Sequence, residues 1–289
     1  MRFTLTHTTH YRYGHPVGLQ PHTLRLRPRS DAAQKLCMFQ QNITPVPDYQ
    51  AEAVDLGGDT TTRIAFGSDQ LRELQIKVHS QVETYRTNPF DYRSEPWAIE
   101  FPLDYPTLLA ARLQPYWLSP LSAPVDSSVV SLAHQIQQET RHSVGYFLTA
   151  LTQRIYESCA YETRETGQPY PAGLTWSQKK GSCRDFAVLF MAACRVVGLA
   201  ARFVSGYQAG DRDQAERDLH AWAEVYIPGG GWRGFDPTLG LAVSDRHIAL
   251  ASGCHPLQAA PVSGTLKQGD IDTTMTTEIQ LRYSDDPAA

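Results

Sequence analysis

The sequence predicts an α+β protein, with an antiparallel β-sandwich at the N-terminus and a following core in which helices precede an antiparallel sheet. Three observations support this fold class. Strand-length segments with alternating hydrophobicity fill residues 1–85, the hydrophobic spacing becomes helical after residue 126, and strand-like segments return after residue 201. The chain has 289 residues, which is enough for one large domain or two moderate ones that each bury a core.

The first 85 residues contain five strand-length segments separated by turn formers. In the last segment, Leu74, Ile76 and Val78 share one face while Gln75 and Lys77 share the other, which is the period of a half-buried strand. The expected strands are Phe3–Tyr13, Leu24–Pro28, Lys35–Thr44, Thr61–Phe66 and Leu74–Tyr85. Together they predict a sandwich domain over residues 1–85.

Residues 86–126 differ in composition from the segments on either side. They carry seven of the chain's nineteen prolines, and large aromatic residues lie among them, including Trp97, Phe101, Tyr105, Tyr116 and Trp117. Proline blocks regular structure, whereas aromatic side chains need burial. We therefore expect an ordered connector that packs against the surface of a domain.

Residues 127–262 are predicted to form the core. Helical spacing runs over Asp126–Glu139, Phe147–Cys159 and Ser182–Val197, the last closed by Gly198. Strands are expected at Arg202–Gln208, Leu219–Ile227 and Trp232–Asp236. Pro228–Gly231 has the chemistry of a hairpin turn between the last two strands.

The tail, residues 263–289, contains one alternating segment, Thr274–Tyr283. A lone strand needs a sheet to pair with, and the N-terminal sandwich is one candidate.

Composition excludes several classes of function. The net charge is −4 and the isoelectric point is near 6.2, and without a Lys/Arg block the chain has no footprint for nucleic acid or an anionic membrane. The longest apolar stretch, residues 186–200, is interrupted by Arg195, and residues 1–7 lack an apolar leader segment. Five irregularly spaced cysteines do not form a disulfide framework. We expect a cytoplasmic protein, and the sequence leaves its oligomeric state open.

Cys183 is the first candidate for chemistry. It follows Gly181 and Ser182 at the predicted start of a buried helix, where the positive end of the helix dipole favours a thiolate. The other four cysteines, Cys37, Cys159, Cys194 and Cys254, are expected to be ordinary small side chains.

His220 and Asp236 are the expected partners of this thiol. His220 opens one predicted strand and Asp236 ends the next. Because a tight hairpin makes these strands neighbours, the two side chains can meet in one sheet. A sheet packed against the cysteine helix would then complete a Cys-His-Asp triad, in which the imidazole is oriented by the carboxylate.

These residues resemble the transglutaminase-like superfamily, which has a papain-like fold. The resemblance rests on the ordered motifs Gly-Ser-Cys-Arg-Asp-Phe-Ala at 181–187, His-Ala-Trp-Ala-Glu-Val-Tyr at 220–226 and Gly-Phe-Asp-Pro-Thr at 234–238. Upstream, Thr8–Pro16 with Leu24–Pro28 resembles the bacterial transglutaminase-like N-terminal region. The resemblance covers nearly the whole chain and implies Cys183 as nucleophile, His220 as base and acid, and Asp236 as the group that orients the imidazole.

The same resemblance implies acyl-transfer chemistry on a peptide or protein amide. Water as acceptor gives a cysteine protease or amidase, which is the favoured prediction, and an amine gives a protein-glutamine transglutaminase. A third alternative is a non-catalytic module that keeps the fold and binds a peptide or protein. An intact triad argues against this last alternative.

The oxyanion donors are less clear from sequence. The backbone N–H of Cys183 lies at a helix start, where developing negative charge is favoured. Trp176 and Tyr161 are further candidates, although core packing is the more ordinary role for each.

We predict no cofactor and no metal. No C-x-x-C pair or H-E-x-x-H motif is present, and the ten histidines are scattered. The acidic segment 211–216 lacks the glycine and the spacing of an EF-hand, and is expected to be a solvated loop over the active site.

Overall fold

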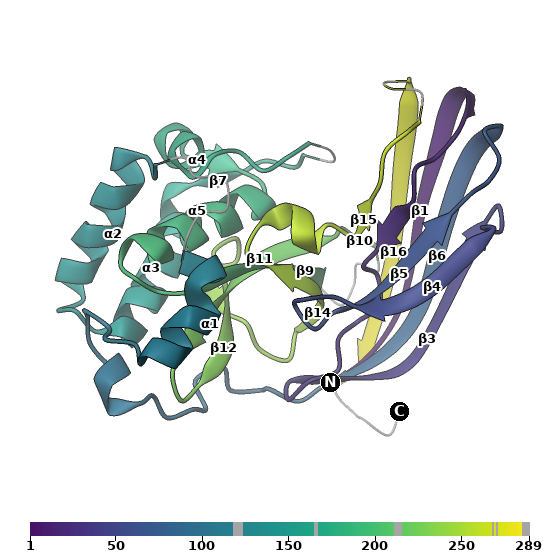
Figure 1. The fold of residues 1–289 in the computed structure, drawn as a ribbon. Helices are drawn as coiled ribbons and strands as arrows, with labels where there is room; N and C mark the ends of the chain where they lie inside the picture. The colour runs from purple at the N-terminus through teal and green to yellow at the C-terminus, as the bar shows by residue number, and fades with distance from the viewer. Residues whose placement is uncertain (118–123, 165–166, 211–215, 268, 270, 285–289) are drawn as a thin grey trace.

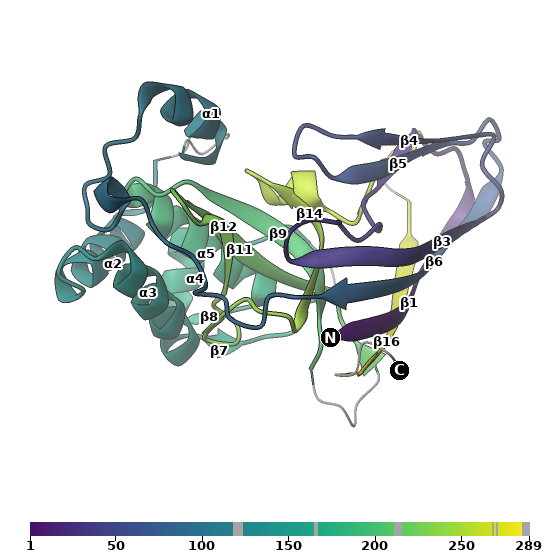
Figure 2. The same ribbon diagram turned by 90° about the horizontal axis from the view of Figure 1, so that it is seen from below.

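The computed structural model describes residues 1–289 apart from 118–123, 165–166, 211–215, 268, 270 and 285–289. The β-sandwich lies next to a second part of the molecule, in which helices cover another sheet. Strands of this second part lie between its helices and the sandwich, as Figure 1 and Figure 2 show. The predicted α+β class and the order of its two parts are confirmed. The acidic segment expected to cover the site lies mostly outside the described residues.

One sheet of the sandwich has the order β10-β16-β1-β6-β3. Its strands are β1 (Arg2–Val17), β3 (Gln34–Thr44), β6 (Leu71–Thr84), β10 (Glu216–Arg217) and β16 (Thr273–Ser284). The strand from the C-terminal tail, β16, pairs antiparallel with β1 along Arg2–Tyr13, so the two ends of the described chain share one sheet. On the inner face of β6, Leu74, Ile76, Val78 and Val82 are fully buried.

The other sheet of the sandwich has the order β15-β2-β5-β4. Its strands are β2 (His22–Leu24), β4 (Tyr49–Val54), β5 (Thr60–Ala65) and β15 (Val262–Ser263). The prediction missed β4, whose side chains are almost all exposed and therefore show no alternation between buried and solvent faces. The strand expected at 24–28 instead occupies His22–Leu24, because the following residues leave the sheet toward the second part of the molecule.

The second part is built on a five-stranded antiparallel sheet of order β13-β12-β11-β9-β14. Its strands are β9 (Ala201–Gln208), β11 (His220–Ile227), β12 (Gly231–Asp236), β13 (Leu241–Ala242) and β14 (His247–Gly253). The helices that cover it are α2 (Ser127–Glu139), α3 (Val144–Ser158), α4 (Ala172–Gln178) and α5 (Cys183–Val196). A short parallel pair, β7 (Ala160–Tyr161) and β8 (Lys180–Gly181), precedes α5.

The helix α5 packs on one face of this sheet. Phe190 of α5 stacks on Phe235 of β12, with ring centroids 5.7 Å apart. Ala221, Ala223 and Val225 on β11 also belong to this buried core. The alternate residues His220, Trp222 and Glu224 project from the opposite face, since successive side chains of a strand point to opposite sides.

The described residues of the connector contain helices that the prolines had concealed. They are η1 (Pro96–Ala98) and α1 (Thr107–Trp117), with Pro115 inside the latter. Residues 108–114 are all good helix formers, and Pro115 removes a donor only in the last turn. Tyr105 packs on Trp117 and Tyr116 on Trp232, with centroids 4.8 and 4.9 Å apart. These contacts leave Tyr105, Tyr116 and Trp117 half-buried, and Phe101 is buried.

The two parts share a continuous apolar interface. Tyr207, Ile248 and Leu250 of the second part are buried in the same cluster as the sandwich core. The Tyr207 hydroxyl also meets Nδ1 of His7 on β1 at 2.8 Å. None of the helices in the described part of the chain combines the length and apolarity needed to span a bilayer.

Candidate active site

Cys183 is the first residue of α5, and Ser182 is its N-cap. The Asp185 carboxylate accepts hydrogen bonds from the backbone N–H and the hydroxyl of Ser182, each at 2.7 Å. This capping box fixes the start of the helix. The Cys183 side chain is largely buried, with 9% of the residue exposed, at the positive end of the helix dipole.

Asp185 also fixes the segment that precedes α4. Its second oxygen accepts from Nη2 of Arg164 at 2.5 Å and from the backbone N–H of Tyr170 at 2.7 Å. Arg184 donates to the carbonyl groups of Arg164 and Gly167. The two charged residues that follow the cysteine therefore hold a neighbouring loop against the helix start.

His220 and Asp236 come from the hairpin that the sequence predicts. The register pairs Ala223 with Phe235, which places His220 and Asp236 on one face as diagonal neighbours. Nε2 of His220 lies 2.6 Å from Oδ2 of Asp236, and Asp236 is fully buried. Because Nε2 is engaged by the carboxylate, Nδ1 is the ring nitrogen available to the thiol.

The electrostatics of His220 depend on its two partners. Burial alone would lower the pKa of the imidazole, but the Asp236 carboxylate and a hydrogen bond with Cys183 outweigh it and raise the pKa to about 10. Burial would likewise raise the pKa of Asp236, but His220 and His247 hold it well below its usual range. At neutral pH His220 therefore carries a proton and lies beside the Cys183 side chain.

His247 is the site residue that sequence reasoning missed. It begins β14, and its Nε2 lies 3.0 Å from the same Oδ2 of Asp236. Every residue of β14 is buried, so the strand lacks the alternation by which half-buried strands are recognised. The sequence contained no other signal for this histidine.

His220, Asp236 and His247 also make a donor set that suits a metal ion, with ligand atoms within 4.8 Å of one another. Two ligands of a tetrahedral zinc ion lie about 3.3 Å apart. The 2.6 Å contact between Nε2 of His220 and Oδ2 of Asp236 is shorter and fits a hydrogen bond. The three residues are thus arranged as a carboxylate with two imidazole donors.

The three oxyanion candidates lie in different surroundings. The Cys183 N–H occupies the first position of α5, where it has no intrahelical acceptor. Tyr161 packs edge-on against Phe186 at 6.5 Å, and burial together with the charge of Cys183 raises the pKa of its phenol. The described contacts of Trp176 are with Lys179 and the core. Tyr161 therefore lies near enough to Cys183 to interact with it electrostatically, and Trp176 packs against the core cluster that includes Cys183.

The other cysteines lie apart from this cluster. Cys194 is fully buried within α5, and burial raises the pKa of its thiol. Cys159 is also buried, Cys37 is exposed on β3 and Cys254 is partly exposed. None of them has a described contact with His220 or Asp236.

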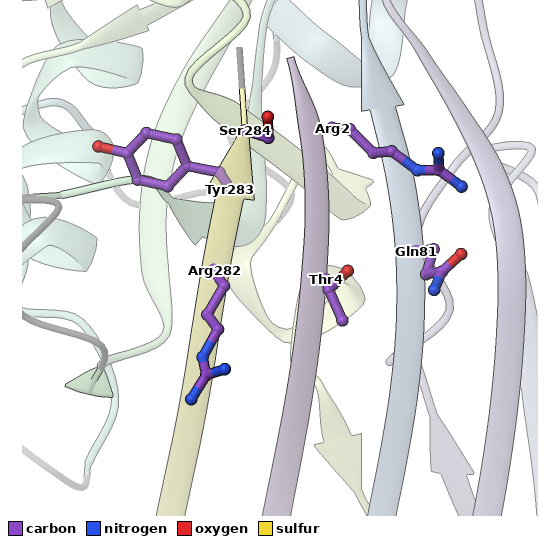
Figure 3. Close-up of a pocket in the computed structure, with 6 residues that line it drawn as sticks. All are labelled: Arg2, Thr4, Gln81, Arg282, Tyr283 and Ser284. Carbon is purple, nitrogen blue, oxygen red and sulfur yellow. The ribbon is translucent and has the colours of Figure 1, made fainter. Parts of the chain in front are cut away.

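Two cavities lie outside the triad. One of about 480 Å³ lies on the outer face of the sandwich over β16, β1 and β6, as Figure 3 shows. It is lined by Arg2, Thr4, Gln81, Arg282, Tyr283 and Ser284 and contains none of the predicted site residues. The other, of about 300 Å³, lies beside the β11–β12 hairpin, and Trp222 and His247 contribute to its wall.

Comparison with known families divides the chain as the structure does. Residues 3–83 match the bacterial transglutaminase-like N-terminal region. Residues 130–237 match the transglutaminase-like superfamily, and this range contains Cys183, His220 and Asp236.

Several proteins are similar to this chain. An uncharacterized protein of Mycobacterium tuberculosis is 27% identical over 294 residues, which is 97% of this chain and 92% of that protein. A protein-glutamine gamma-glutamyltransferase of Pseudomonas aeruginosa is 32% identical over 130 residues, 40% of this chain and 20% of that protein. The crystal structure of a candidate cysteine protease from Cytophaga hutchinsonii has a TM-score of 0.72 at 21% identity, over 99% of this chain and 92% of that chain. The last likeness establishes a shared fold.

Proposed function

We propose that this chain is a thiol-dependent enzyme that acts on amide bonds of peptides or proteins. It joins a bacterial transglutaminase-like N-terminal region to a transglutaminase-like superfamily core. Cys183, His220 and Asp236 are its proposed triad. The observation that carries the proposal is the 2.6 Å contact between His220 and a buried Asp236, on a histidine that also hydrogen-bonds Cys183. Nucleophile, proton carrier and orienting carboxylate thus form one connected set.

In the proposed acylation step, the Cys183 thiolate attacks the amide carbonyl carbon. A carbon–sulfur bond forms, and the carbonyl electron pair moves to oxygen as an oxyanion, which the Cys183 N–H is placed to stabilise. Collapse of this intermediate breaks the carbon–nitrogen bond. The imidazolium of His220 gives its proton to the leaving amine, and a thioester on Cys183 remains.

In the proposed deacylation step, neutral His220 takes a proton from the acceptor, which attacks the thioester and releases the thiolate. We propose water as the acceptor, which makes the enzyme a cysteine protease or amidase. The similar fold of the Cytophaga protein supports this choice. The Pseudomonas relative favours an amine acceptor as the second candidate, and the acid-base steps are the same for both.

A non-catalytic binding module is the remaining alternative. In a module of that kind, the raised pKa of His220 and the burial of Asp236 would bring no benefit, while burying a charged pair costs free energy of desolvation. The presence of this costly pair favours an enzyme.

The acceptor can be tested without knowing the natural substrate. The protein would be mixed with 4-nitrophenyl acetate, an activated acyl donor, in the absence and presence of methylamine. We expect a burst of nitrophenolate and acetylation of Cys183, absent in Cys183→Ala but retained in the matched variant Cys254→Ser. Free acetate as the main product in both conditions supports a hydrolase, whereas N-methylacetamide supports a transferase. No acetyl-enzyme on Cys183 would contradict the proposed function.

The proposed location is a reducing, cytoplasmic compartment. The chemistry needs Cys183 as a free thiol, and all five cysteines are unpaired. Cell fractionation with an antibody against the protein tests this, and recovery outside the cytoplasm would contradict it.

A further inference from the structure

Asp236 is held by four donors, which is more than orientation of one imidazole requires. Its Oδ1 accepts from the backbone N–H groups of Thr238 and Leu239, at 2.9 and 3.3 Å. Its Oδ2 accepts from His220 at 2.6 Å and from His247 at 3.0 Å. A fully buried carboxylate needs such partners to stay ionised. His247 is the one side-chain donor among them that the proposed chemistry does not use.

The hydrogen bonding of His247 assigns its tautomer. Within the described part of the chain its Nδ1 has no partner, while Nε2 faces the Asp236 carboxylate, so Nε2 carries the proton. Burial lowers the pKa of His247, the positive charges of His220 and Arg246 lower it further, and Asp236 only partly offsets them. His247 is therefore a neutral, permanent hydrogen-bond donor to Asp236.

The position of His247 is fixed on both sides. Its ring packs edge-on against the buried Trp222, with centroids 5.2 Å apart. Its strand β14 is tied to the N-terminal sandwich, because the Gln34 amide exchanges hydrogen bonds of 2.7 and 2.9 Å with the backbone of Ala249. The backbone N–H of Ser252 donates to Asp59 at 2.6 Å. The sandwich thus holds the strand that carries His247.

We propose that His247 is a positioning residue for the triad, which fixes and stabilises the Asp236 carboxylate by donating from Nε2 to Oδ2. The catalytic part of this inference rests on the proposed function. It assigns a role to a residue that neither the sequence motifs nor the β11–β12 hairpin identifies. It also assigns a structural role to the N-terminal sandwich, because the sandwich supports β14. Donors from two strands, β11 and β14, then hold Oδ2 of the Asp236 carboxylate.

The test compares variants that keep or lose the donor. His247→Gln places an amide N–H near the position of Nε2, whereas His247→Asn keeps a polar group that is too short to reach it, and His247→Leu removes the donor. His7→Leu is the matched control, because His7 is also fully buried but bonds Tyr207 and Thr9, away from the triad.

Two readouts are recorded for each variant. The first is the titration of the Asp236 carboxyl carbon by NMR, which does not depend on activity. The second is the rate of Cys183 alkylation by limiting iodoacetamide at neutral pH. A positioning partner of this kind is expected to be worth about a tenfold change or more.

We expect His247→Leu and His247→Asn to raise the pH at which Asp236 titrates by about one unit or more and to slow Cys183 alkylation about tenfold. His247→Gln and His7→Leu should stay close to the wild type in both readouts. An unchanged Asp236 titration in folded His247→Asn or His247→Leu would overturn the inference, as would equal effects of Gln and Asn. If Cys183 of the wild type is not selectively alkylated but the Asp236 titration responds as expected, the proposed function fails while the positioning role stands.

Discussion

Asp185 accepts two hydrogen bonds from Ser182, one from the backbone N–H and one from the hydroxyl, at 2.7 Å each. These two residues flank Cys183 and Arg184, so the start of α5 is closed around the proposed nucleophile. The carboxylate is fully buried, and its other oxygen is bound to Arg164 and to the N–H of Tyr170. Asp185 therefore connects the helix cap, the neighbouring loop and the segment that carries the proposed nucleophile.

Replacing Asp185 by alanine should loosen this end of the helix. We expect a loss of about 1 to 3 kcal/mol in the free energy of unfolding, because the cap is lost and buried donors are left unsatisfied. Cys183 alkylation should slow in the same variant. Urea unfolding and peptide-mapped labelling provide the two measurements. Asp126→Ala removes the cap of α2 and is the control, with a stability loss of about 1 kcal/mol and unchanged Cys183 reactivity.

Glu224 should contribute strongly to stability, in a pH-dependent manner. It pairs with Arg29 of the sandwich at 3.0 Å and with Arg202 at 2.6 Å, and all three side chains are mostly buried. Burial alone would raise the pKa of Glu224, but Arg202 and Arg29 outweigh it and lower the pKa to about 2. Because the folded pKa lies below the ordinary value of 4.5, the stabilisation is complete above pH 4.5 and is lost as the pH falls toward 2.

The variant Glu224→Gln leaves two buried guanidinium groups short of a counter-charge. We expect it to lower the free energy of unfolding by about 3 to 5 kcal/mol at pH 7 and to flatten the loss of stability between pH 4.5 and pH 3. Urea titrations at pH 7, pH 4.5 and pH 3 measure both effects. The exposed pair of Glu52 with Arg27 is the control, and Glu52→Gln should cost at most about 1 kcal/mol. Equal costs for the two variants would show that the buried network adds no stability.

Gly206 is required by close packing beneath the hairpin. It pairs with His220 across β9 and β11, and a methyl group on it would collide with the carbonyl oxygen of Ile248 and the ring of Trp222. Gly206→Ala should therefore destabilise the fold by about 1 to 3 kcal/mol. Gly145 in α3 has open space around it, so Gly145→Ala should stabilise by up to about 1 kcal/mol. Thermal unfolding of the two alanine variants compares them, and a tolerated Gly206→Ala would contradict the packing around Trp222.

The proposed acid role of His220 predicts the pH above which the rate of acyl transfer falls. Since the imidazole pKa is raised to about 10, the proton needed by the leaving amine is present at neutral pH and is lost as the pH rises through that value. Acylation by an amide substrate should fall above pH 10, whereas alkylation of Cys183, which needs only the thiolate, should persist. An alkaline limb near the ordinary histidine value, about 6.5, would mean that Asp236 does not hold the proton on His220.

The sequence was sufficient for the parts of the site that follow from local rules. Ser182 and Gly198 delimit α5, and the turn at 228–231 makes β11 and β12 neighbours. Cys183, His220 and Asp236 could therefore be grouped from the sequence alone. The same patterns delimited most strands of the sandwich, because one face of each is buried. Both successes depend on periodicity or on turn chemistry, which are visible over a few residues.

The remainder depends on contacts that short patterns do not record. His247 reaches Asp236 only because β14 joins the far edge of the sheet beside β9, and β14 is buried on both faces. The exposed strand β4 and the helix α1 were missed for complementary reasons, since one has no buried face and the other is bracketed by prolines. Tertiary packing decides these elements.

The central claim is that Cys183 is a nucleophile activated by His220. The most direct test labels the native protein with a limiting amount of iodoacetamide and maps the modified cysteine by mass spectrometry, for the wild type, His220→Ala, Asp236→Asn and, as a control, the exposed His134→Ala. Because Cys37 is more exposed than Cys183, exposure alone would direct the label to Cys37. We predict selective labelling of Cys183 that is retained in His134→Ala, weakened in Asp236→Asn and lost in His220→Ala. Labelling that follows exposure, or full Cys183 reactivity in His220→Ala, would contradict the account.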